Sequence, residues 1–118
     1  MSLLPDRRGY LWHIRDAAAA IIKFTREIDE ATYISNDLVH SAVERKFEII
    51  GEALKLLSQV DPELAAKFPD RLKIIAFRNL LAHGYAVVEH DRVWEVSQNE
   101  LLVLQKVVVE LLDEFDAQ

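Results

Sequence analysis

The chain of 118 residues is 51% hydrophobic, contains no cysteine and carries a formal net charge of −6. This length fits one domain over residues 1–118 with a real core, and the lack of cysteine excludes disulfides and thiolate chemistry. The acidic balance argues against a protein that coats nucleic acid, because such proteins are usually basic. We expect a cytoplasmic location, since no signal peptide opens the chain and no apolar run is long enough to span a membrane.

The first half of the chain predicts two long helices. Only three glycines and three prolines occur, and the apolar residues recur at the three- and four-residue spacings of helices. A first helix is expected over 6–28, with Asp6 as its N-cap, and the polar stretch 29–36 is expected to be a loop. A second helix is expected over 37–59, with Asn36 as its cap, because this side chain can accept from a free backbone N–H.

The middle of the chain predicts a short helix and then a longer one. The Asp-Pro pair at 61–62 starts the short helix, which ends before the proline at position 69. The longer helix is expected over about 69–82, where Gly84 follows and can adopt the left-handed conformation that closes a helix. A loop or short turn is expected next, anchored by Trp94.

The last helix is expected to begin at Ser97, because residues 97–100 form a capping-box pattern ahead of an apolar run. This run is apolar on more than one face, so the helix is either central in the bundle or shared with a second subunit. Together these elements predict an all-α fold, an antiparallel four-helix bundle with a short additional helix.

The most informative stretch is 78–85, which reads Arg-Asn-Leu-Leu-Ala-His-Gly-Tyr. It lies in the locally basic segment 67–88, which holds four basic residues and one acidic residue, whereas 89–118 holds eight acidic and two basic residues. Arg78 suits the geometry of a phosphate, and His83 can move a proton near neutral pH. Phosphodiester cleavage needs both of these functions.

The spacing of these groups constrains how they can act together. Five residues along a helix turn by roughly 500°, which leaves Arg78 and His83 about 140° apart, whereas Asn79 and His83 share a face. The two groups can therefore meet where the helix unwinds at Gly84, or across the two-fold axis of a dimer. If the motif has only a structural role, the Arg-Asn pair would cap a neighbouring helix and His83 would make its hydrogen bonds at the helix end.

The motif resembles the signature of the HEPN superfamily, an Arg and a His with four residues between them. Tyr85, two residues after the His, narrows the resemblance to HepT-like proteins. The segment 42–53 is similar to the second helix of that family, and Val93-Trp94 also matches. The resemblance therefore covers roughly residues 37–112.

The resemblance implies a HEPN-like homodimer that is the ribonuclease toxin of a type VII toxin–antitoxin system. It would cleave tRNA or mRNA without a metal or other cofactor, with Arg78 stabilising the phosphate, His83 as acid or base and Asn79 orienting it. The implied partner is a MntA-like nucleotidyltransferase antitoxin that adenylylates Tyr85. This modification would silence the toxin, because a bulky anionic adenylate would fill the cleft and repel RNA. Two alternatives stay open: a non-catalytic HEPN dimer that binds nucleotide or protein, and a purely structural dimer.

Several other polar residues also need an interpretation. The remaining histidines lack the spacing of metal ligands and are expected at the surface or at helix caps: His13, His40 and His90. Three glutamates step by four along one predicted helix face: Glu44, Glu48 and Glu52. Carboxylates so placed can hold a metal, but a solvated and salt-bridged face is expected here. Gly51, in mid-helix, costs about 1 kcal/mol relative to Ala, so we expect it to permit a close helix contact, at the dimer or beneath the motif.

Overall fold

The computed structural model describes residues 7–83 and 88–117, and within these ranges every regular element is a helix. The four long helices are α1 (Arg7–Thr25), α3 (Asp37–Val60), α5 (Arg71–His83) and α7 (Glu100–Asp116). The three short helices are α2 (Glu30–Ser35), α4 (Pro62–Ala65) and α6 (His90–Gln98). None of these helices combines the length and the apolarity needed to cross a bilayer. The predicted all-α class and four-helix bundle are confirmed, with two short helices more than expected.

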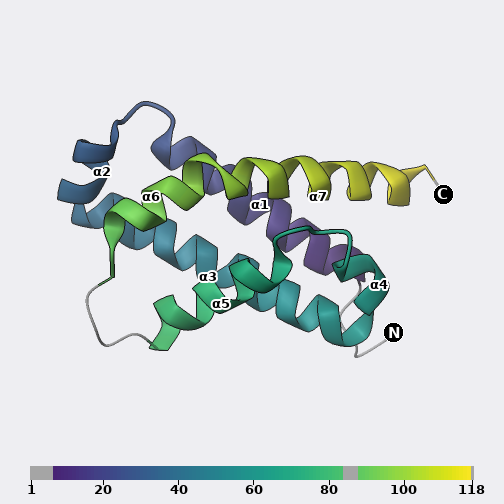
Figure 1. Cartoon of the computed structure of the whole chain (residues 1–118). Coiled ribbons are helices and arrows are strands. Elements are labelled where there is room, and N and C mark those ends of the chain that lie inside the picture. Colours follow the sequence, from purple (N-terminus) through teal and green to yellow (C-terminus); the bar gives the residue numbers. More distant parts are fainter. Residues whose placement is uncertain (1–6, 84–87, 118) are drawn as a thin grey trace.

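The long helices pack side by side around the pair α1 and α3 (Figure 1). α7 lies along α1, and α5 lies along α3. α2 and α6 meet at one end of the bundle, whereas α4 follows α3 at the other end. The predicted apolar stripes of α1, α3 and α7 provide most of the core, which includes Leu11, Ile14, Ile21, Phe47, Ile50, Leu54, Leu101, Leu104 and Val108.

Two predicted helix caps are present in the structure. The Asn36 side chain accepts a hydrogen bond of 3.1 Å from the backbone N–H of Val39 at the start of α3. The Asp61 side chain accepts one of 3.1 Å from the N–H of Leu64 at the start of α4. Each cap satisfies a backbone donor that has no partner within its own helix, and so fixes where the helix begins.

The expected loop over 29–36 is wrong, because most of this stretch forms α2. The Asp29 side chain accepts a hydrogen bond of 2.8 Å from the N–H of Thr32 and caps the helix. One turn later, Tyr33 is completely buried. A polar stretch therefore folds as a helix because it has a strong cap and one large apolar anchor.

The expected loop around Trp94 is also wrong, since this residue lies within α6 and packs on Tyr33 with ring centroids 5.4 Å apart. Ser97 does not start the last helix. Its hydroxyl donates backward to the carbonyl oxygen of Trp94 at 2.6 Å, within α6. The break falls at Asn99, whose side-chain amide donates to the carbonyl oxygen of Glu95 at 2.8 Å. The capping-box pattern is thus used for a different local bond.

Candidate active site

The candidate site is built on a close contact between α3 and α5. Gly51 is buried in α3 directly beneath Arg78 of α5. A Cβ atom at position 51 would lie 2.1 Å from the Cβ of Arg78 and 2.7 Å from its Cγ, distances that no real contact has. The absence of a side chain at Gly51 therefore lets α5 approach, and of the two places predicted for this contact the structure has it beneath the motif.

Arg78 is held by two polar neighbours. Its Nη2 lies 2.8 Å from the Oε2 of Glu52 on α3, and its Nη1 donates to the Oδ1 of Asn79 at 3.0 Å. The Arg78 side chain is 20% exposed, whereas that of Glu52 is 42% exposed. The guanidinium is therefore oriented by a carboxylate whose side chain is partly exposed, although the oxygen that contacts Arg78 is covered. Asn79, expected to orient His83, here makes its contact with Arg78.

Arg78 lines a pocket of about 200 Å³ between α1, α3 and α5. Its lining mixes apolar side chains with polar and charged ones, and the latter include Tyr10, His13, Arg45, Glu48 and Glu52. Arg45 pairs with Glu48 at 3.2 Å, so each of the two guanidinium groups has a carboxylate beside it. No pattern in the sequence indicates that α1 contributes to this pocket, since Tyr10 and His13 lie far from the motif along the chain.

His83 is the last residue of α5, and its side chain is exposed. His83 is not among the residues that line the pocket at Arg78. Within one chain the two groups thus face different directions, as the helical spacing predicts. Tyr85 and Gly84 lie outside the described residues.

The outward face of α5 is unusually apolar beside these polar groups. Leu72 is 69% exposed and Leu80 is 59% exposed, and Ala76 lies between them at helical spacing. Asn79 and His83 fall on the same face. Exposed leucines in a row are typical of a surface that another subunit covers.

The expectation that the other histidines lie at the surface or at helix caps is wrong for His40, which is buried in α3. His40 of α3 and His90 of α6 stack with ring centroids 3.8 Å apart, and Glu44 lies beside both. Tyr33 is buried next to them, and burial together with the Glu44 charge raises the pKa of its hydroxyl above the usual range. His13 is exposed, as expected.

The helical bundle, with an Arg and a His five positions apart on its α5 helix, defines a protein of the HEPN type. A family model described as "Ribonuclease HepT-like" matches residues 14–111. The chain therefore belongs to the HepT-like ribonuclease family.

Curated relatives cover nearly the same length. A "putative RNase" of Methanocaldococcus jannaschii is 30% identical over 105 residues, which are 87% of this chain and 94% of the relative. A "putative RNase" of Caldanaerobacter subterraneus is 32% identical over 105 residues, 89% of this chain and 93% of the relative. A "probable ribonuclease HepT" of Thermococcus cleftensis is 31% identical over 96 residues, 81% of this chain and 86% of the relative. No solved structure gives a significant match.

Proposed function

We propose that this protein is a metal-independent endoribonuclease that acts as a homodimer. The proposal rests mainly on Arg78, whose guanidinium is oriented, partly exposed and placed in a pocket, on the same helix as an exposed His83. Membership of the HepT-like ribonuclease family and the names of the relatives support it.

The two side chains supply complementary parts of the reaction. The ribose 2′-oxygen attacks phosphorus and loses its proton to solvent, and the bond from phosphorus to the 5′-oxygen breaks. Arg78 stabilises the charge that builds on the phosphoryl oxygens, because its planar fork matches their geometry. His83 gives its proton to the departing 5′-oxygen. Asn79 positions Arg78 through the hydrogen bond between their side chains.

Dimerisation would bring these groups together. Because Arg78 and His83 of one chain point about 140° apart, we propose that Arg78 acts with His83 of the partner subunit. A two-fold contact through the apolar face of α5 would bury Leu72 and Leu80 and place both copies of the motif at one interface. The exposed second face of α7, which includes Leu102 and Val103, offers a further surface for contact between subunits.

The first experiment measures cleavage of structured RNA by the purified full chain in excess EDTA. We expect cleavage to persist, and His83→Ala to reduce it by about 10²–10⁴-fold with unchanged circular dichroism. Arg78→Lys keeps the positive charge but loses the planar guanidinium that can bind a phosphate through two N–H groups. We expect it to reduce cleavage by about 10²-fold or more. Arg71→Lys, on the same helix, is the matched control. Equal cleavage by wild type and His83→Ala would remove His83 from the mechanism.

A second experiment separates the two possible site geometries. Arg78→Ala and His83→Ala are each expected to be inactive alone. In a mixed dimer, one site still combines an intact Arg78 with the intact His83 of the partner subunit. Co-refolded mixtures should therefore recover part of the wild-type activity. No recovery, with mixed dimers verified by mass spectrometry, would show that each site lies within one chain.

The net charge of −6 favours a second candidate, a HEPN dimer that binds nucleotide or protein without cleaving RNA. An acidic protein repels a polyanion over most of its surface. In that case Arg78→Ala would weaken RNA binding, while no cleavage product appears with any variant.

We further propose that the enzyme is a toxin silenced by a nucleotidyltransferase antitoxin that adenylylates Tyr85. Support comes from the sequence motif alone, since Tyr85 lies outside the described residues. Incubation with the transferase and ATP should raise the protein mass by one or more adenylates. The Tyr85→Phe variant should show no change, and a mass increase that persists in this variant would contradict the proposal.

A further inference from the structure

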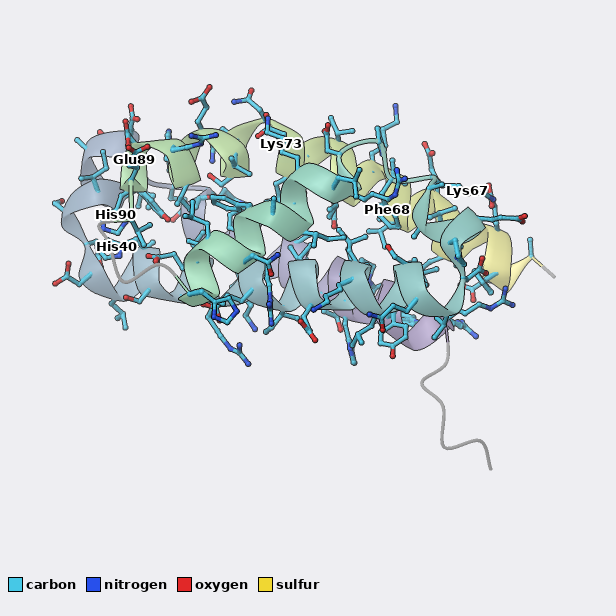
Figure 2. The ribbon with its side chains drawn as sticks, turned by 60° about the horizontal axis from the view of Figure 1, so that its bottom comes forward. His40, Lys67, Phe68, Lys73, Glu89 and His90 are labelled. Carbon is cyan, nitrogen blue, oxygen red and sulfur yellow. The ribbon has the colours of Figure 1, made fainter. Side chains whose placement is uncertain are left out.

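A second cluster of polar side chains lies where α2 and α6 meet α3, at the end of the bundle. His40 and Glu44 are one turn apart on α3, and His90 is the first residue of α6. Figure 2 shows the side chains of His40 and His90 next to each other. Their rings are stacked, with an interplanar angle of 24°. The Oε2 of Glu44 lies 3.3 Å from the Nδ1 of His40 and 3.8 Å from the Nδ1 of His90.

These groups are largely withdrawn from solvent and lack conventional partners. His40 is only 9% exposed, and Glu44 and His90 are also mostly covered. Neither Nδ1 atom makes a hydrogen bond within the described part of the chain. The nearby hydroxyl of Tyr33 is also buried without a partner. Glu44 is the polar group nearest to both Nδ1 atoms, and a buried polar atom without a hydrogen bond is costly, so these nitrogens are suited to bind a ligand.

We propose that His40, Glu44 and His90 bind a Zn²⁺ ion. Two imidazole nitrogens and a carboxylate oxygen form a common zinc donor set, in which water completes the tetrahedron. Two ligands that are each 2.0–2.1 Å from a tetrahedral zinc ion lie about 3.3 Å apart. The donor atoms here all lie within 4.8 Å of one another, and two of their separations are 3.3 and 3.8 Å. The ion therefore fits with small side-chain adjustments.

Asp37 supplies the outer contact that such a site requires. Its Oδ1 lies 3.1 Å from the Nε2 of His40, on the side of the ring opposite Nδ1. Histidines that bind a metal usually donate their other ring N–H to a carboxylate, which fixes the tautomer. With the proton on Nε2, the lone pair of Nδ1 points toward Glu44, where the ion would bind.

Zinc binding requires one local movement. A metal lies in the plane of each imidazole that binds it, so the stacked rings of His40 and His90 cannot both reach one ion without turning. Rotation about the χ2 angle of histidine is soft, so one ring can turn at little cost. The ion then ties the start of α6 to α3. It acts as a structural clamp, because none of its ligands lines the pocket at Arg78.

The test uses the full chain without an affinity tag, stripped of metal by a chelator and then dialysed. Titration with Zn²⁺ alone, by calorimetry and by metal analysis, should give one ion per chain. Co²⁺ as an optical probe should give the visible absorption of a tetrahedral site. Zinc should also raise the midpoint of thermal unfolding, because it binds the folded chain.

Two variants and one control make the test specific. His90→Gln and Glu44→Gln should each weaken zinc affinity by at least about 10-fold, since even the loss of an outer contact often costs that much. His13→Gln removes an exposed histidine outside the cluster and should bind zinc like the wild type. If His90→Gln folds poorly, Glu44→Gln gives the same comparison.

The proposal would be overturned by a wild-type chain that binds no zinc, or by equal zinc affinity in Glu44→Gln and in the wild type. Both readouts, metal binding and thermal unfolding, are independent of RNA cleavage. The zinc site can therefore be confirmed even if the protein does not cleave RNA, and it can be refuted even if the protein does.

Discussion

The substitution Gly51→Ala tests whether the contact between α3 and α5 positions Arg78. The added methyl group would meet the Cβ of Arg78 at 2.1 Å, its Cγ at 2.7 Å and the carbonyl oxygen of Ile74 at 3.3 Å. Cβ and carbonyl atoms belong to the backbone framework and cannot rotate away. α5 must therefore move outward by more than an ångström to restore ordinary contact, which begins at 3.4 Å.

The expected loss of stability follows from two opposing effects. Overpacking a close contact costs about 1–3 kcal/mol, and a clash with rigid atoms belongs at the upper end of that range. Alanine in place of glycine inside a helix recovers about 1 kcal/mol of helix propensity. The net destabilisation is then about 2 kcal/mol. For a chain of this size, that corresponds to a fall of about 8 °C in the unfolding midpoint.

Urea and thermal unfolding, followed by circular dichroism at a fixed protein concentration, measure this difference. Gly9→Ala in α1 is the matched control, because nothing lies within 4 Å of the added Cβ there. It should leave stability unchanged or raise it by up to about 1 kcal/mol. RNA cleavage should fall in Gly51→Ala but not in Gly9→Ala, because only the first substitution displaces Arg78. If Gly51→Ala were as stable as Gly9→Ala, the proposed packing beneath Arg78 would be refuted.

Three further predictions concern the interface, the core and one cap. Leu80→Glu should yield monomers in analytical ultracentrifugation and abolish cleavage, whereas Leu38→Glu, at an exposed leucine of α3, should remain dimeric. Phe47→Ala should lose about 3–5 kcal/mol of unfolding free energy in urea, because this ring is fully buried. The Arg7 guanidinium and a backbone N–H lower the pKa of Asp61 below its usual 3.8. The ionised carboxylate therefore stabilises the fold above that pH, and its contribution is lost as the pH falls through the lowered value. The wild type should exceed Asp61→Asn in stability at pH 7, and this difference should shrink in measurements toward pH 3.

The parts of the fold that the sequence predicts are those with local causes. The long helices follow from apolar spacing, and the Asn36 and Asp61 caps follow from side chains that reach a donor three residues away. Gly51 was also informative, because a glycine inside a long helix weakens that helix unless a neighbour needs the space. The local pattern at Ser97 led to a wrong prediction. Its hydroxyl could cap the following helix or bond to the preceding turn, and it donates to the preceding turn.

The contacts that the sequence could not predict join residues far apart along the chain. His90 meets His40 only because α6 forms and packs over the end of α3, and α6 itself carried too weak a pattern to be recognised. The pairing of Glu52 with Arg78 likewise depends on the register of α5 along α3. Helical periodicity places a residue on a face, but only packing decides what that face meets.

The evenly spaced carboxylates of α3 show how one helix face can serve different purposes. Each has its own kind of partner: Glu44 faces His40 and His90, Glu48 pairs with Arg45, and Glu52 pairs with Arg78. Glu52 is the most exposed of the three side chains, although its Oε2, which contacts Arg78, is covered. In the proposed reaction, a phosphate would offer Arg78 a bidentate partner in place of its single contact with Glu52. Glu52 would then keep the guanidinium aimed at the pocket until RNA binds, so that an acidic protein still presents one cation in a fixed orientation.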